Sequence, residues 1–219
     1  MGIHERKERE KEQRRNEIID AAEKVFFFKG IENATMDEVA ETAELSKGTL
    51  YLYFKSKEDI HFAICRRGLE ILMDKLGEVV EEDKSVLENL IRVGLAFVKF
   101  SREYVDYFKV MSHFEIKEQC EDDDIHQHTE KDNVMQLLVS LIDKGKKDST
   151  IRVDIDSGIV AHILWAQTTG VLQLMSAQKY HLDMNTTSND EVIMTHFELV
   201  ANGIKAGNEV LDIKKYFKS

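Results

Sequence analysis

The spacing of apolar residues predicts a helical chain, beginning with a helix over residues 5–29. Its apolar residues recur at the i, i+3, i+4, i+7 spacing of one buried face: Ile18, Ile19, Ala22, Val25 and Phe26. The first three turns are almost wholly charged, and Gly30 follows the last turn as a helix terminator. We therefore expect this helix to be buried along its C-terminal half.

Three short segments with helix-capping residues follow. Thr35 and Glu38 have the spacing of a capping box before a short helix over 36–43, and Ser46 is an N-cap for a helix over 47–54. Ser56 with Asp59 opens a fourth helix. Two short helices joined by a three-residue turn have the arrangement of a helix-turn-helix unit.

The rest of the chain continues the helical pattern. The fourth helix is predicted to run from 57 to about 82, because its apolar positions keep one face without a breaker. Five more helices are predicted over 86–101, 104–118, 133–147, 158–178 and 191–211. Residues 151–155 alternate as a strand would, but only three alternations occur and no partner strand is evident, so an extended loop is favoured.

Composition narrows the class of protein. The 219 residues contain no proline, where average usage of about 5% would supply about 11, which supports an all-α fold. Neither a secretory signal nor an apolar run of about 18 residues occurs, and the two cysteines are expected to be reduced thiols. We expect a cytoplasmic protein without a membrane span.

Two sequence motifs carry a family resemblance. The runs TMDEVA at 35–40 and SKGTLYLYFKSKED at 46–59 resemble the TetR family of transcriptional regulators. The resemblance implies a helix-turn-helix DNA-binding domain over 1–57, and a long helix leading into a helical ligand-binding and dimerisation domain over 58–219. It further implies a homodimeric repressor that a small-molecule inducer releases from a double-stranded DNA operator with pseudo-palindromic sequence. The chain departs from the family at Glu44, where glycine is common; a left-handed glutamate would cost about 1 kcal/mol.

The DNA-contacting residues are expected around the predicted recognition helix. Leu50 and Phe54, four residues apart, anchor it and leave the opposite face for the major groove. The expected contacts are Thr35, Lys47, Gly48, Thr49, Tyr51, Tyr53 and Lys57. Residues 45–57 carry three basic and no acidic side chains, so their net charge is +3. Because the whole chain has a net charge of −11, the other residues together carry −14. The upstream basic residues Arg6, Lys7, Arg9, Lys11, Arg14 and Arg15 form either a self-paired solvated helix or a DNA-contacting arm.

A ligand cavity and a dimer interface are expected in the remaining helices. Candidate ligand-binding residues are Phe97, Phe100, Tyr104, Tyr107, Phe108, Met111, His162 and Trp165, although most aromatic residues also serve as core and His162 also suits a structural role. The inducer is expected to be largely apolar and neutral or anionic. Small residues along the last two long helices resemble the family's dimerisation helices: Ala166, Gly170, Ala177, Ala201, Gly203, Ala206 and Gly207.

Two alternatives to a ligand-responsive regulator stay open. One is a DNA-binding regulator controlled by a partner protein. The other is a helical metal-dependent hydrolase using the metal-ligand types between His113 and His128, whose spacing fits an acidic solvated turn better than a zinc site. No catalytic residue, metal site or cofactor is predicted, and Cys65 is expected to be a small buried apolar residue.

Overall fold

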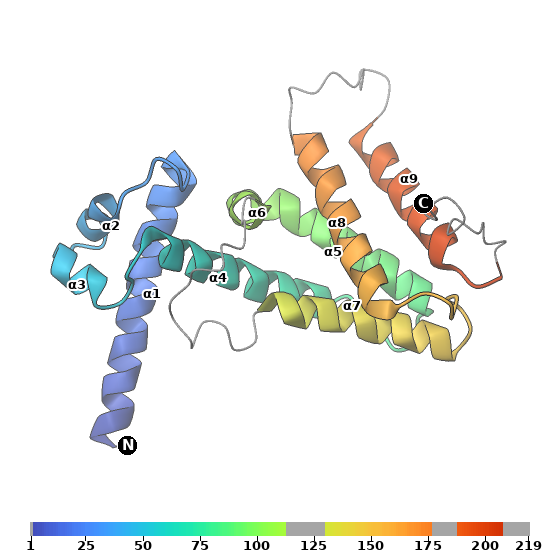
Figure 1. Cartoon of the computed structure of the whole chain (residues 1–219), viewed down its shortest axis with the longest axis horizontal. Coiled ribbons are helices and arrows are strands. Elements are labelled where there is room, and N and C mark those ends of the chain that lie inside the picture. The colour runs from blue at the N-terminus through green and yellow to red at the C-terminus, as the bar shows by residue number, and fades with distance from the viewer. Residues whose placement is uncertain (1, 113–129, 177–187, 208–219) are drawn as a thin grey trace, which may run out of the picture. The chain divides into compact units, whose positions relative to one another are not determined.

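The computed structural model describes residues 2–112, 130–176 and 188–207 (Figure 1). Regular structure in these ranges consists of nine helices, and the extended pairing there is one antiparallel bridge between Ile151 and Lys205. The helices are α1 (Ile3–Lys29), α2 (Met36–Thr42), α3 (Lys47–Tyr51), α4 (Lys57–Gly77), α5 (Val86–Glu103), α6 (Val105–Ser112), α7 (Glu130–Lys147), α8 (Ser157–Ser176) and α9 (Asn189–Ile204). The all-α prediction is confirmed.

Several helix ends differ from the sequence prediction. Helix α4 ends at Gly77 instead of about 82, α3 ends at Tyr51 instead of 54, and α9 ends at Ile204. In the last case Arg152 donates its backbone N–H to the Ile204 carbonyl at 3.0 Å, which ties the end of α9 to the extended loop. The predicted ends at 118, 178 and 211 lie outside the described residues.

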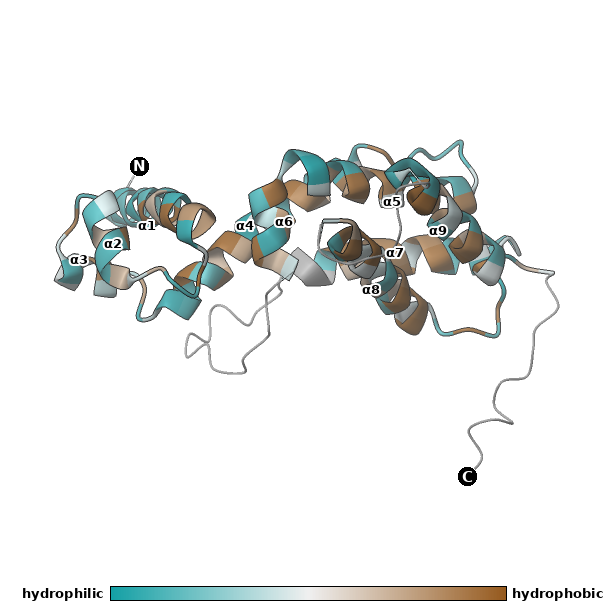
Figure 2. Cartoon of the chain, turned by 90° about the horizontal axis from the view of Figure 1, so that it is seen from above, coloured by the Kyte–Doolittle hydropathy of each residue, from teal (hydrophilic) through white to brown (hydrophobic). Residues whose placement is uncertain are grey.

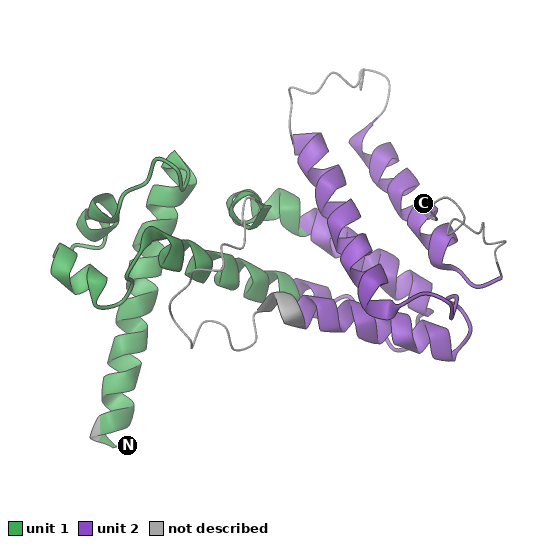
Figure 3. Ribbon diagram, viewed as in Figure 1, with its two compact units in different colours: residues 1–73, 100–131 green, residues 74–99, 132–219 purple. Residues whose placement is uncertain are grey.

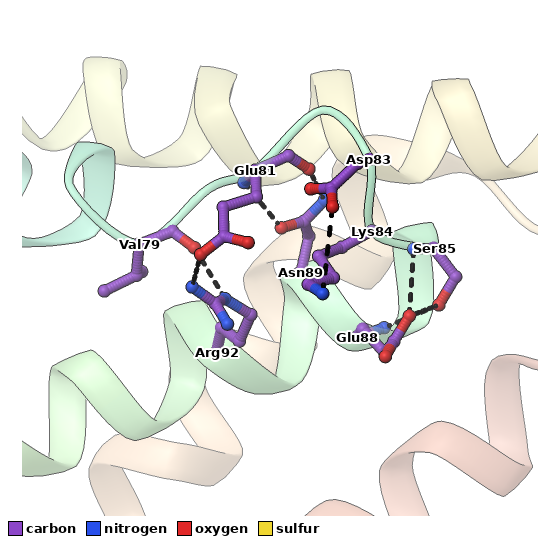
Figure 4. Close-up of polar contacts among 8 residues, drawn as sticks. All are labelled: Val79, Glu81, Asp83, Lys84, Ser85, Glu88, Asn89 and Arg92. Atoms are coloured by element: carbon purple, nitrogen blue, oxygen red, sulfur yellow. Dashed lines mark hydrogen bonds and ion pairs between the residues drawn. The ribbon is translucent and has the colours of Figure 1, made fainter.

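The early end of α4 follows from polar contacts in the α4–α5 loop (Figure 4). The buried Asn89 side chain donates to the Glu81 carbonyl at 2.7 Å and accepts from the Glu81 N–H at 3.0 Å. Arg92 donates to the Val79 carbonyl at 2.8 Å and pairs with the Glu81 carboxylate. Because α5 side chains satisfy these backbone groups, the loop is held in a non-helical path. Helical periodicity in residues 79–82 does not reveal these contacts.

The chain divides into two compact units (Figure 3). Unit 1 comprises residues 1–73 and 100–131, and unit 2 comprises 74–99 and 132–219. A core cluster in unit 1 joins α1 to α4 through buried residues that include Ile18, Phe26, Val39, Leu50 and Ile64. The functional boundary expected at residue 57 stays a prediction, since compactness alone defines these units.

Unit 2 has a core of its own. Hydrophobic and hydrophilic residues alternate along α5 in Figure 2, as expected for a helix with one buried face. The buried residues of this unit include Val93, Phe97, Leu138, Ile142 and Ile193. The loop after α7 contributes Ile151, which is fully buried and forms the bridge to Lys205. Residues 153–155 form a turn and a bend, so a loop is present here as predicted, but it is extended only at its start, where it has the partner that the sequence did not show.

Candidate functional site

The start of α2 is fixed by a reciprocal capping box. The Thr35 side chain accepts from the Glu38 N–H at 3.3 Å, and the Thr35 N–H donates to the Glu38 carboxylate at 3.1 Å. Glu38 also pairs with Lys29, which together with the Thr35 contact lowers the pKa of the Glu38 carboxyl. The predicted cap at this position is confirmed.

The turn between α2 and α3 contains a left-handed glutamate. Glu44 has φ 56°, and the next residue, Leu45, donates its N–H to the Ala40 carbonyl at 2.9 Å. The Ser46 hydroxyl then accepts from the Thr49 N–H at 3.1 Å and caps α3. The backbone conformation that usually favours glycine is therefore present, with a glutamate in it.

The predicted anchors of the recognition helix are confirmed. Leu50 is 0% exposed and Phe54 is 2% exposed, and both belong to the core of unit 1. The Arg15 guanidinium of α1 lies 4.8 Å from the centre of the Phe54 ring, within the range of a cation–π contact. The segment that follows α3 thus contacts α1, and Leu50 anchors α3 itself in the same core.

The residues expected to contact DNA lie on or beside the outer face of this unit. Thr35, Lys47, Gly48 and Tyr51 are exposed, whereas Thr49, Tyr53 and Lys57 are half-buried. Tyr53 packs against the core, and the Lys57 ammonium donates to the Glu32 carbonyl at 3.3 Å. All seven residues come from one short stretch of unit 1, and their contacts with DNA stay predictions.

Two further residues on this surface were missed from sequence. Leu52 follows α3 and is 81% exposed. Asp37 in the first turn of α2 accepts from the Lys47 ammonium at 2.5 Å. Their separation of ten residues is not a helical spacing, so only the turn between α2 and α3 brings the two together.

The N-terminal part of α1 contains ion pairs along its own surface. Arg6 pairs with Glu10 at 2.8 Å, and Arg14 pairs with Glu17 at 2.7 Å. These i,i+4 and i,i+3 pairs fit the self-paired helix that was one of the two interpretations of this stretch.

A polar cluster in unit 1 joins α1, α4 and α6. The Arg67 guanidinium contacts Asp20 at 2.6 Å and Glu23 at 3.0 Å, and the Tyr107 hydroxyl donates to Glu23 at 2.6 Å. Burial and the Glu23 carboxylate both raise the pKa of the Tyr107 hydroxyl. A side chain at Gly68 would come within 3.0 Å of Tyr107, so glycine allows α6 to approach α4 closely.

Unit 2 contains an apolar cavity. Its walls come from the end of α4 and from α5, α7, α8 and α9: Leu76, Leu87, Leu90, Ile91, Val93, Gly94, Phe97, Val134, Leu138, Leu164, Trp165, Thr168, His196, Phe197, Val200, Ala201 and Ile204. Phe97 and Trp165 stack with ring centroids 4.8 Å apart. The free volume is about 50 Å³, enough for a few water molecules.

The polar groups of this cavity wall are Thr168 and His196. The Thr168 hydroxyl donates to the Leu164 carbonyl at 2.8 Å, so its oxygen accepts from His196 Nε2 at 3.1 Å. This arrangement places the proton of a neutral His196 on Nε2 and leaves Nδ1 as an acceptor. Burial lowers the pKa of His196 and favours that neutral form.

The structure separates the residues expected to bind a ligand. Phe97 and Trp165 line the cavity, whereas Phe100, Tyr104, Tyr107, Phe108 and Met111 belong to unit 1. Phe100 stacks on Tyr104 with centroids 5.2 Å apart. His162 is exposed on α8, with Nδ1 2.8 Å from the Gly158 carbonyl. His196 and Phe197 were not predicted, because their approach to α5 and α8 is a long-range contact.

Helices α8 and α9 lie side by side (Figure 1). Both helices carry exposed large apolar residues, which with Gly170 and Gly203 are called the apolar row. The exposed fractions are 62% for Ile159, 45% for Ile163, 46% for Leu174, 64% for Met194 and 69% for Leu199. Gly170 and Gly203 are also exposed, and a side chain at either position would meet nothing within 4 Å in this chain. Ala177, also expected in this row, lies outside the described residues.

Three further sequence predictions concern possible metal ligands, Cys65 and membrane spans. Residues 113–128, the possible metal ligands, fall outside it, and the residues within it do not bring three potential ligands together. Cys65 is buried as predicted, and burial raises the pKa of its thiol to about 12. None of the described helices is long and apolar enough to span a bilayer.

Comparison with known proteins places this architecture among transcriptional regulators. Residues 18–64 match the sequence model of bacterial regulatory proteins of the tetR family. The HTH-type transcriptional repressor KstR2 of Mycolicibacterium smegmatis is 24% identical over 87% of this chain and 90% of its own length. The fatty acid metabolism regulator protein of Bacillus subtilis is 32% identical over 35% of this chain and 40% of its own length.

A solved structure extends the likeness of fold over most of the chain. The crystal structure of AibR in complex with isovaleryl coenzyme A and operator DNA superposes with a TM-score of 0.62, at 16% identity, over 85% of this chain and 97% of that one. The helix-turn-helix match, the relatives and the common fold lead to one assignment. The chain belongs to the TetR family of DNA-binding transcriptional regulators.

Proposed function

We propose that the protein is a ligand-responsive repressor, which binds a pseudo-palindromic operator as a homodimer and is released by a largely apolar small molecule. The observation that carries this proposal is the presence, in one chain, of a capped helix-turn-helix surface and a separate apolar cavity. KstR2 is named a transcriptional repressor, and AibR was solved with both a ligand and operator DNA.

The exposed face around α3 supports operator binding. Lys47 can donate to guanine in the major groove, and the exposed Tyr51 is suited to a phosphate. Gly48 lets the backbone approach the DNA, because its position has no neighbour closer than the Ser46 hydroxyl at 3.9 Å. The Leu50 and Phe54 anchors keep this face in a fixed orientation.

The apolar row on α8 and α9 supports a dimer. Large apolar side chains exposed together on neighbouring helices favour a protein partner over water. Gly170 and Gly203 leave room for close approach of helices from a second copy. A two-fold dimer presents two recognition helices about 34 Å apart, which requires two half-sites related by inverted symmetry.

The cavity supports an apolar ligand whose binding changes the shape of unit 2. Ligands of drug size need about 300–1,000 Å³, so a space of about 50 Å³ must widen to admit one. One wall residue, Leu76, lies in the last turn of α4, and the same helix begins at Lys57, the last residue of the recognition segment (residues 35–57, which contain α2 and α3). We infer that α4 transmits the widening to the DNA-binding segment, with a coupling of about 1–3 kcal/mol.

Selection from a random-sequence duplex library tests operator binding. The wild-type protein should enrich an inverted repeat with half-site centres about one helical turn apart. Lys47→Ala should weaken binding to the enriched duplex by about 1–3 kcal/mol and relax the base preference at one position per half-site, without moving the thermal midpoint. Tyr53→Phe should weaken binding less. Enrichment of no sequence would contradict the proposed function.

A further inference from the structure

The contact between Asp37 and Lys47 places an acidic group in the proposed DNA-binding surface. Its carboxylate lies 2.5 Å from the Lys47 ammonium, and both side chains are well exposed, at 60% and 65%. A carboxylate on such a surface opposes DNA phosphates, so its presence there needs an explanation.

Helix stability does not explain this pair. Glu38 already supplies the carboxylate of the capping box, and Ser46 already caps α3. Asp37, in the first turn of α2, suits the dipole of that helix whether or not it pairs with Lys47, and Lys47, as the first residue of α3, is unfavourable to the dipole of α3. Exposed ion pairs contribute little to folding. The pair is therefore better explained by what the surface binds.

The geometry restricts where the Lys47 ammonium can act. A free lysine on a flexible four-carbon stem reaches phosphates along either strand. Asp37 instead holds this ammonium at the junction of α2 and α3, the two helices of the helix-turn-helix unit. On DNA of any sequence, a phosphate that approaches this ammonium meets the negative Asp37 carboxylate beside it, whereas a base edge carries no net charge.

We propose that Asp37 is a specificity-determining residue, which keeps Lys47 away from phosphates and available for a base edge in the major groove. In the operator, Lys47 donates to guanine O6 or N7, while Asp37 can accept from the N4 amino group of a cytosine. Non-operator DNA gains neither contact and still meets the carboxylate. The proposal rests on operator binding by the α3 face, and it assigns to Asp37 a role in discrimination between sequences.

The test compares affinities for two duplexes of equal length and composition. One is the duplex that the wild-type protein enriches from a random library, and the other is its scrambled sequence. Asp37→Asn should tighten binding to the scrambled duplex by about 3- to 10-fold and steepen the slope of log affinity against log salt by about 0.9, the value for one added phosphate contact. Affinity for the selected duplex should change by less, so the ratio of the two affinities falls.

Two further variants separate discrimination from general charge repulsion. Glu41→Gln removes the same charge from an exposed position on α2 and should leave the affinity ratio unchanged. In a Lys47→Gln background, Asp37→Asn should lower the ratio by less, because the part of the effect that acts through the lysine is gone and only the direct contacts of Asp37 remain. Circular dichroism should show at most a small change in thermal midpoint for any variant, because these charges are exposed.

The outcomes distinguish this inference from the function on which it rests. An unchanged ratio for Asp37→Asn, or the same fall in the ratio in the Lys47→Gln background, would overturn the role of Asp37 while leaving operator binding intact. Failure of the wild-type protein to prefer any sequence would overturn both.

Discussion

The recognition segment (residues 35–57 of unit 1) and the cavity of unit 2 are held together by different kinds of contact. Residues close together in the sequence make the contacts in the first, and residues far apart in the sequence make them in the second. In the recognition segment, Thr35 contacts Glu38 and Ser46 contacts Thr49, each three residues apart. Around the cavity, Thr168 contacts His196, 28 residues away, and Gly94 faces Phe197 on another helix. The first region is defined by local contacts and the second by packing between distant helices.

This difference determines what each region can do. Local caps keep the shape of the recognition segment, which suits the DNA binding that we propose for its outer face. The cavity lies between helices whose own starts are capped by Ser85, Asp156 and Ser188, but apolar packing between these helices encloses it, so it can widen only when they move apart. We therefore expect substitutions near the cavity to affect ligand response and assembly, and substitutions in the recognition segment to affect DNA binding.

The largest expected effect concerns assembly through α8 and α9. Gly170→Leu adds a side chain where the single chain has free space, so the monomer should fold normally while the dimer is lost. Loss of the second half-site should weaken operator binding by at least about 100-fold. Sedimentation velocity and DNA titration measure the two effects. Gly77→Leu, at another open position, is the control, and a normal Gly170→Leu dimer would place the interface elsewhere.

A smaller effect is expected from a substitution within the cavity wall. The methyl group of Gly94→Ala would overlap the ring of Phe197, and such overpacking destabilises by about 1–3 kcal/mol. Because both residues line the cavity, ligand binding should weaken as well. Gly77→Ala should show neither loss. Chemical denaturation of the two variants provides the comparison, and equal stabilities would argue against tight packing of α5 on α9.

The next effect has the opposite sign and lies in the recognition segment. Glu44→Gly relieves a left-handed glutamate and should raise the free energy of unfolding by up to about 1 kcal/mol. Glu41→Gly, within α2, should lower it by about 0.5–1 kcal/mol. If Glu44→Gly proved destabilising, the glutamate would have to make contacts that outweigh its strain.

The smallest effect is a pH dependence from His196. Burial lowers its pKa below the usual 6.5, so the unfolded chain binds more protons near that pH than the folded chain does. Stability should therefore fall as the pH drops below about 6.5, and His196→Gln should reduce this loss. Thermal melts of both proteins between pH 7.5 and pH 5, in steps of roughly 0.5, measure it; coincident profiles would show that burial of His196 is not linked to folding.

The same contrast explains how much the sequence could predict. The caps at Thr35 and Ser46, the anchors Leu50 and Phe54 and the left-handed Glu44 all follow from local spacing or from the family motif. The end of α4 was predicted wrongly, because Asn89 and Arg92 act on the loop from the next helix.

Prediction of the cavity was limited in the same way. Clustering in sequence placed Phe97 together with Phe100 to Met111, but Phe97 faces Trp165 whereas Tyr107 contacts Glu23 of α1. Apolar residues that are close in the sequence can belong to two different cores, and helical periodicity does not show to which core each residue belongs. The Asp37–Lys47 pair was missed because it depends on the angle of the turn between α2 and α3.

A titration that follows Trp165 and operator DNA together tests the central claim most directly. Trp165 is the sole tryptophan and lies in the cavity wall, stacked on Phe97. In a series of apolar ligands with a neutral or anionic end, those that change its fluorescence should release the selected duplex over the same concentration range. Fluorescence changes that leave the duplex bound, or release without any change at Trp165, would contradict control of DNA binding through this cavity.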